Sequence, residues 1–173
     1  MDVAHTVLLL PEDTENPYAS DAKSILNILT IKSLYPDVYA CVEMVDPKNV
    51  EHCRRAGADE IIVVGELSTN LLVQAALDHG ITRMITELVS NRFGNSVYKI
   101  KPMAGHIGKS FFEVMCDLKK SSNILCLGVI AAAGRKLNTN PEADYTISED
   151  DELMVIAESR PDLSAHAKEI PRP

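Results

Sequence analysis

The stretch Thr6-Val-Leu-Leu-Leu10 is an uninterrupted apolar run near the start of a chain of 173 residues. Turn-forming and acidic residues follow it at once, in Pro11-Glu-Asp-Thr-Glu-Asn-Pro17. A short apolar run that ends at such a turn is typical of a strand buried in a parallel sheet. We therefore predict a strand over 6–10, and this strand sets the fold class because helices and strands alternate after it.

The segments after this first strand repeat the order strand, helix, strand. Pro36 ends the first predicted helix, Asp46-Pro47 begins the second as an N-cap residue with a first-turn proline, and Gly57 ends it. The expected strands are 6–10, 38–43 and 60–64, and the expected helices are 18–34, 47–57, 65–77 and 81–89. Helices at this spacing connect parallel strands by right-handed crossovers. The pattern predicts an α/β fold with a partial doubly wound, Rossmann-like parallel sheet.

A complete nucleotide-binding fold of this kind begins with a strand that leads into a glycine-rich phosphate loop. Only five residues precede Thr6, so this loop is expected to be absent. The predicted sheet then corresponds to the second half of such a domain. We do not expect this chain alone to bind a dinucleotide in the usual way.

The pattern changes after Ser90-Asn-Arg-Phe-Gly-Asn95, whose composition is that of a linker. Beyond it, the expected elements are strands over 97–101, 123–130 and 153–157, a helix over 110–119 and a turn over 131–135. These elements make a small α+β module. The expected domains are residues 1–94 and 95–160, followed by a polar tail over 161–173.

The composition excludes several classes of protein. The net charge is −8, with 25 acidic and 17 basic residues and no stripe of Lys and Arg, so we expect no nucleic-acid partner. No apolar run approaches the ~20 residues that span a bilayer, and the first residues lack the basic region of a secretory signal. We expect a cytoplasmic protein. The four cysteines form no CxxC pair, and three of them, Cys41, Cys116 and Cys126, are predicted to be buried apolar residues.

Acidic residues follow two of the predicted strands. Glu12 and Asp13 come directly after the first strand, and Glu43 closes the second. Because ligands collect at the carboxyl ends of parallel strands, these carboxylates could meet there and bind a divalent cation such as calcium. The alternative is that Glu12 and Asp13 belong to a solvated turn.

The segment Gly105-His-Ile-Gly-Lys-Ser110 resembles a phosphate loop in part. The Walker pattern requires a glycine where this chain has Met103, so we interpret the segment as a turn that opens a helix at Lys109 and Ser110. His106 is interpreted as an exposed or capping residue. No familiar nucleophile or metalloprotease context occurs, and we predict that the chain is not an enzyme.

The two helices predicted over 65–89 carry more apolar residues than three strands can cover. The residues in excess are Leu71, Leu72, Ala75, Ala76, Ile81, Met84, Ile85 and Leu88. We therefore expect these helices to pack against a second copy of the chain.

Several segments resemble one family when they are taken in order. Asp2–Asp13, Arg54–Glu60 and Glu66–Val89 resemble a strand, a turn and the crossover helices of RCK domains, the regulators of potassium conductance that are related to TrkA and KTN domains. Gly108–Glu113, Asn140–Tyr145 and Asp151–Ala157 are similar to the TrkA-C module. The chain departs from the family pattern in its missing glycine-rich half.

The resemblance implies a ligand-sensing, non-catalytic domain of a gating ring. It implies a homodimer, assembled into an octameric ring in the full channel, and a membrane potassium pore as partner. Calcium-gated members carry carboxylates at positions equivalent to Leu10, Cys41 and Glu43, of which only Glu43 matches. Related C-terminal modules bind small ligands, and Asn140, Asp144 and Tyr145 are candidates for this, or form a turn.

Two other functions stay open at this point. The chain could be a fragment of an NAD-dependent oxidoreductase, since such enzymes share this half of the fold. It could also be a purely structural module that completes a ring. The ligand is unknown from the sequence, beyond a small molecule or a divalent cation.

Overall fold

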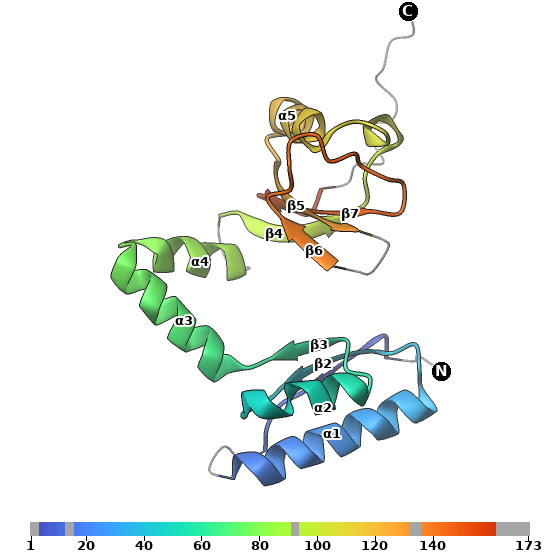
Figure 1. The fold of residues 1–173 in the computed structure, drawn as a ribbon, viewed down its shortest axis with the longest axis vertical. Helices are drawn as coiled ribbons and strands as arrows, with labels where there is room; N and C mark the ends of the chain where they lie inside the picture. The colour runs from blue at the N-terminus through green and yellow to red at the C-terminus, as the bar shows by residue number, and fades with distance from the viewer. Residues whose placement is uncertain (1–3, 13–15, 91–93, 132–135, 162–173) are drawn as a thin grey trace, which may run out of the picture. The chain divides into compact units, whose positions relative to one another are not determined.

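The computed structural model describes residues 4–12, 16–90, 94–131 and 136–161 (Figure 1). The chain folds into two compact units, residues 1–79 and 80–173, and each unit has its own buried core. The domain limits expected at residues 94 and 160 stay predictions. None of the helices that the structure describes has both the length and the apolar composition needed to cross a bilayer.

Unit 1 is built on a three-stranded parallel sheet with the strand order β1-β2-β3. Its elements are β1 (Thr6–Leu9), α1 (Pro17–Leu34), β2 (Tyr39–Glu43), the 3-10 helix η1 (Pro47–Asn49), α2 (Val50–Arg55), β3 (Glu60–Ile62) and α3 (Val64–Leu77). The alternation of strands and helices in this parallel sheet confirms the predicted α/β fold.

Helices α1 and α2 cover the same face of this sheet (Figure 1). The buried residues of the core between them are Ile28, Ala40, Val42, Met44, Cys53 and Ala56. Successive side chains of a strand point to opposite faces of the sheet, so the strand residues that alternate with the buried ones point away from the two helices. There Leu8, Tyr39 and Ile62 are 60%, 44% and 39% exposed, which leaves this face open among the described residues.

The second predicted helix is divided in the structure into η1 and α2. Asp46 has an extended backbone and its side chain accepts a hydrogen bond from the Lys48 N–H at 2.9 Å, as expected for an N-cap. Gly57 has φ +99° and ends this segment, which confirms the stop that the glycine predicted.

The segment around Gly57 closes the sheet edge where the strands begin. Lys32 of α1 donates from Nζ to Asp59 Oδ2 at 2.6 Å and to the Val38 carbonyl at 2.7 Å. The same Asp59 oxygen accepts the Ala40 N–H at 2.8 Å. A Cβ on Gly57 would lie 3.2 Å from Lys32 Cγ, so this glycine lets the lysine side chain pass close to the backbone.

Strand β3 is shorter than the predicted strand over 60–64. Glu43, the last residue of β2, is in register with Ile62, so the strand loses its ladder partner beyond that point. The chain turns into α3 at Val64 instead.

Unit 2 is built on a four-stranded antiparallel sheet with the order β4-β7-β5-β6. Its elements are α4 (Ile81–Val89), β4 (Ser96–Ile100), the 3-10 helix η2 (Ala104–His106), α5 (Phe111–Ser122), β5 (Leu125–Ala131), β6 (Lys136–Thr139) and β7 (Glu152–Ala157). Helix α5 and the four-stranded sheet form the small α+β module that the sequence predicts.

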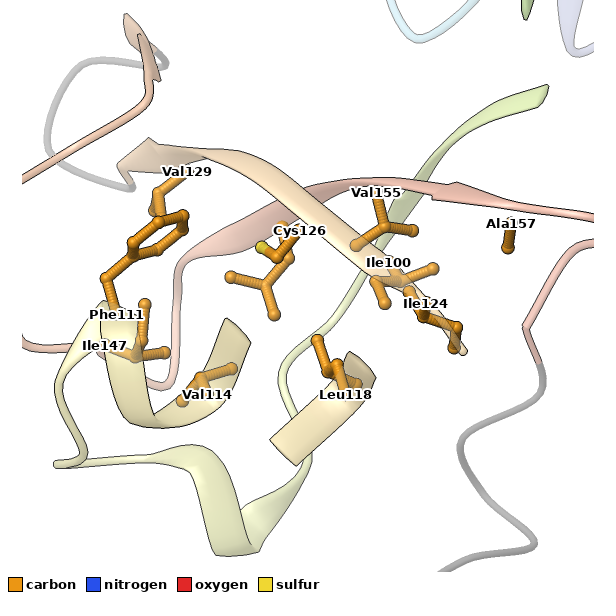
Figure 2. Packing of buried hydrophobic residues seen from close by; sticks show 11 residues of the cluster. Ile100, Phe111, Val114, Leu118, Ile124, Cys126, Val129, Ile147, Val155 and Ala157 are labelled. Atoms are coloured by element: carbon orange, nitrogen blue, oxygen red, sulfur yellow. The ribbon is translucent and has the colours of Figure 1, made fainter. Parts of the chain in front are cut away.

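Helix α5 and the sheet enclose the core of unit 2. Figure 2 shows Phe111, Val114 and Leu118 of α5 pointing toward the sheet, with the Phe111 ring beside Val129 of β5. Val114 and Leu118 have no exposed surface, and Phe111 is 4% exposed. Burial of such side chains stabilises the unit by about 1.5–3 kcal/mol each.

Strand β6 was not predicted from the sequence. Its residues Lys-Leu-Asn-Thr are all exposed, so they lack the apolar alternation of a half-buried strand. It is held as an edge strand by antiparallel pairing with β5, from Gly128–Thr139 to Ala131–Lys136. The turn predicted over 131–135 lies outside the described residues except for its first residue.

Candidate functional site

The first candidate site is the edge of the unit 1 sheet where the three strands end. Glu12 lies just beyond β1, and its Oε2 accepts from Lys23 Nζ on α1 at 2.5 Å in an exposed ion pair. Glu43 ends β2 and is half-buried. Asp13 lies outside the described residues. The described residues contain no group of three His, Cys, Asp or Glu side chains that could hold a metal ion, and the calcium site stays a prediction.

A buried carboxylate, Asp21, lies on α1 beside this edge. It is 1% exposed, and its two oxygens accept from the N–H groups of Val45 and Asp46 at 2.9 and 3.0 Å. Its Oδ2 also accepts from Asn49 Nδ2 at 2.8 Å. Asp21 thus holds the loop that follows β2. Its three donors are all parts of this chain, so the carboxylate is occupied as a structural group.

Asp21 was missed in the sequence because it reads as an ordinary polar residue in a helix. The spacing of the residues is the signal that could have revealed Asp21. Asp21 precedes Ser24 by three residues and Ile28 by seven, so the three share a helix face, and in the structure all three are buried. An acidic residue on the buried face of a helix requires partners elsewhere in the fold.

The segment over 105–110 opens α5, as the sequence predicts. Ser110 Oγ accepts the Glu113 N–H at 3.3 Å, and Glu113 Oε2 accepts the Ser110 N–H at 2.9 Å in return. The Ser110 hydroxyl, which donates to Glu113 Oε2 at 2.7 Å, and the Ser110 N–H together lower the pKa of Glu113. The next two backbone donors, the N–H groups of Phe111 and Phe112, donate to the carbonyls of Tyr145 and Ala143. The first donors of the helix are therefore occupied within the chain, so this helix start is not an open phosphate site.

The candidate ligand residues of unit 2 belong to a structured turn. Asn140 has φ +53°, and its N–H donates to the Leu127 carbonyl at 2.8 Å. The Tyr145 hydroxyl donates to Asp151 Oδ2 at 3.2 Å, and Asp151 is 2% exposed. Burial, with the Asp151 carboxylate beside it, raises the pKa of Tyr145. Asp144 is exposed.

The cysteines are free thiols, and Cys53 and Cys126 are buried. Burial raises the pKa of the Cys126 thiol to about 11, so it is not ionised near neutral pH. Of the three cysteines predicted to be buried apolar residues, Cys126 confirms the prediction, whereas Cys41 and Cys116 are half-buried.

The second candidate site is the apolar surface of the helices α3 and α4. None of the 14 residues of α3 and none of the nine residues of α4 is buried. On α3, Leu72 and Leu77 are each 72% exposed, and Leu67 is 63% exposed. On α4, Met84 and Val89 are 54% and 75% exposed. Exposed apolar surface on this scale marks a site of association.

A family model described as Castor and Pollux, part of voltage-gated ion channel, matches residues 58–171. The chain belongs to this family. Its match begins in the turn before β3 and includes α3, α4 and unit 2 up to residue 171, so the family relationship spans both candidate helices.

Relatives and solved structures agree with this assignment. The chain is 26% identical to the calcium-gated potassium channel TvoK of Thermoplasma volcanium over 92% of its own length and 43% of that protein. It is 29% identical to the probable ion channel POLLUX of Arabidopsis thaliana over 90% of its own length and 19% of that protein. The chain therefore spans less than half the length of these relatives.

The fold is similar to that of the human SLO3 gating ring, with a TM-score of 0.71 and 20% identity over 90% of this chain and 33% of that one. The predicted resemblance to RCK regulatory domains of potassium channels is confirmed by these matches. They give no support to the alternative of an oxidoreductase fragment.

Proposed function

We propose that this chain is a non-catalytic regulatory module that senses a ligand and controls a potassium channel or potassium transport system. The observation that carries the proposal is the match of residues 58–171 to a family of ion channels. One relative is named a calcium-gated potassium channel, and the chain is 26% identical to that protein over 159 residues. Residues 1–94 are the proposed RCK-like domain, and residues 95–160 are the proposed TrkA-C-like module.

The proposed mechanism is a shift between two arrangements of the assembled modules. A ligand changes such an equilibrium only by binding one arrangement more tightly than the other. In the complete protein, that difference in binding free energy would act on a membrane pore, with this module on the cytoplasmic side. The acidic residues at the end of the unit 1 sheet are the proposed site for a divalent cation.

The proposed assembly is a homodimer formed through α3 and α4, and a larger ring in the full channel. A helix of 14 residues is marginal in water unless its apolar face is packed. Leu67, Leu72 and Leu77 have no such packing in the described chain, where each is more than 60% exposed. A second copy of the chain would cover them.

Replacing Leu72 and Leu77 together by glutamate should abolish this dimer. Burial of two leucines contributes about 3–6 kcal/mol, so we expect the dissociation constant to rise by a factor of roughly a hundred or more. Light scattering over a range of concentrations measures the mass, which should be twice 19.0 kDa for the unchanged chain and 19.0 kDa for the variant.

The control is Gln74→Glu, which adds one negative charge, half of what the double variant adds, at an exposed polar position of α3. It should leave the mass of the dimer unchanged. If the unchanged chain is a monomer at high concentration, the proposed interface is wrong.

Ligand sensing is tested by thermal unfolding with calcium, other divalent cations, adenine nucleotides and cyclic dinucleotides. A ligand at a hundred times its dissociation constant stabilises the native state by about 2.7 kcal/mol. We expect calcium to raise the melting temperature and Glu43→Gln to weaken calcium binding roughly tenfold or more in calorimetry.

Lys23 forms an ion pair with Glu12 in the free protein and so competes with a bound cation for this carboxylate. Lys23→Met should therefore strengthen the binding of calcium in the same calorimetric measurement.

Glu158→Gln is the control for this series, because it removes one exposed carboxylate from unit 2. A calcium isotherm that is the same in Glu43→Gln and in the unchanged chain would contradict the proposed cation site. A panel in which no ligand changes the melting temperature would contradict ligand sensing.

A further inference from the structure

One histidine lies in the interior of unit 2, where the proposed function does not use it. His106 is 1% exposed and ends η2, in the loop that leads into α5. The other histidines that the structure describes, His5, His52 and His79, are exposed. The sequence interpretation of His106 as an exposed or capping residue is wrong about exposure, because the loop folds the imidazole inward, and is confirmed for capping, because the ring accepts the N–H of Met103, the N-cap residue of η2.

The contacts of the ring decide which nitrogen carries the proton. Nδ1 accepts the backbone N–H of Met103 at 3.4 Å, so this nitrogen uses its lone pair as an acceptor and carries no proton. The proton of the neutral ring is therefore on Nε2. Nε2 lies 3.3 Å from Asp117 Oδ2 on α5, without the alignment of a full hydrogen bond.

A second proton on the ring is incompatible with this arrangement. It would bind to Nδ1 and face the Met103 N–H, so that two donors would point at each other. The same two residues are joined through the backbone, where the His106 N–H donates to the Met103 carbonyl at 2.8 Å. Protonation of the ring therefore acts directly against the turn that forms η2.

The charged groups around the ring do not offset this cost. Asp117 of α5 attracts a proton to the ring, but its side chain is 50% exposed and water screens it. Lys109, between η2 and α5, repels a proton. Asp151, the buried carboxylate of the segment that pairs with this loop, already accepts the Ser148 N–H at 2.9 Å. Burial dominates these influences and lowers the pKa of His106.

The loop that His106 anchors is joined to a second segment of unit 2. The Gly108 N–H donates to the Ile147 carbonyl, and the Ile147 N–H donates to the Lys109 carbonyl, both at 2.9 Å. Ile147 and Phe111, at the two sides of this junction, enter the core (Figure 2). A change at His106 is thus transmitted to the packing at the start of α5.

We infer that His106 is a proton-sensitive latch of unit 2: binding of a proton to its imidazole opens the segment over 103–110, while the strands of the sheet stay paired. The neutral ring is favoured in the folded chain. Its contribution to stability is complete above the ordinary pKa of 6.5 and is lost as the pH falls from that value toward the lower pKa of the folded state. This inference goes beyond the proposed function and does not depend on it.

The unchanged chain provides the first test, by nuclear magnetic resonance. We expect the His106 ring signal to titrate below pH 6.5, the ordinary value of a histidine. Amide exchange, corrected for its intrinsic rate, should speed up at Gly108 and Ile147 between about pH 7.5 and about pH 5.5. The amides of β5 and β7 should keep their protection. A His106 signal that titrates at or above pH 6.5 overturns the inference.

The second test compares His106→Gln with the control His79→Gln. Glutamine keeps a side-chain oxygen that can accept a hydrogen bond, one bond further from the backbone than Nδ1, but it cannot take up a proton. Between about pH 7.5 and about pH 5.5, we expect the melting temperature of unit 2 to fall on the order of 5 °C further in the unchanged chain and in His79→Gln than in His106→Gln. Asp117→Asn should steepen this fall, because it removes the attraction for the proton. An equal fall in His106→Gln and His79→Gln overturns the inference.

Discussion

Replacing Asp21 by alanine should lower the free energy of unfolding of unit 1 by about 3–5 kcal/mol. The substitution leaves three donors without their acceptor, namely the N–H groups of Val45 and Asp46 and the amide of Asn49. Asp21 is 1% exposed, so water cannot replace the lost carboxylate without opening the loop after β2. The loss is expected at the edge of the sheet that carries the candidate cation site.

Urea unfolding, followed through amide signals of Ala40 and Val42 for unit 1 and of Val129 and Val155 for unit 2, separates the two units. The midpoint should fall for unit 1 only. Asp37→Ala removes an exposed carboxylate from the same unit and should change its stability by less than about 0.5 kcal/mol. Similar midpoints in the two variants would show that Asp21 does not hold the loop.

Replacing Gly128 by alanine should destabilise unit 2 by about 1–3 kcal/mol, and replacing it by valine should cost more. A Cβ at this position would lie 2.5 Å from the Asn138 carbonyl oxygen and 3.1 Å from Thr139 Cα. Both atoms belong to the backbone of β6, so rotation of a side chain cannot relieve the steric clash. The added carbon would push the edge strand away from β5, next to the register shift between Cys126 and Gly128.

Gly105→Ala is the matched control, because a Cβ there has no atom within 4 Å. Its effect on unit 2 should stay below about 0.5 kcal/mol. Chemical denaturation measures both variants, and the amides of β6 should lose protection against exchange in Gly128→Ala first. If Gly128→Ala is as stable as Gly105→Ala, β6 can shift without loss of stability, and the prediction is wrong.

The periodicity of apolar residues, together with the turn residues, was enough to predict most of the elements of both units. The three strands of unit 1 and the helices between them follow from runs such as Thr6–Leu10 and from stop signals such as Gly57. Strand β6 was not predictable in this way, because its side chains are exposed and its position depends on pairing with β5. The end of β3 was misjudged for a similar reason, since its ladder partner ends at Glu43.

The candidate sites were predictable only in part. The positions of Glu12 and Glu43 after parallel strands, and the apolar excess on the segment that forms α3 and α4, can be read from residue order. The pairing of Glu12 with Lys23 on α1 cannot, because it joins side chains that are far apart in the sequence.

By itself, the sequence determined the alternating α/β pattern of unit 1, the α+β module of unit 2 and the helices left without an apolar partner, because local periodicity and turn residues carry that information. Only the tertiary structure decided that Asp21 and His106 are buried, and that Gly128 lies against the backbone of β6. Each of these depends on a group that another segment brings within contact distance. Such contacts produce no periodic pattern of residues in the sequence, since they form only when the units fold.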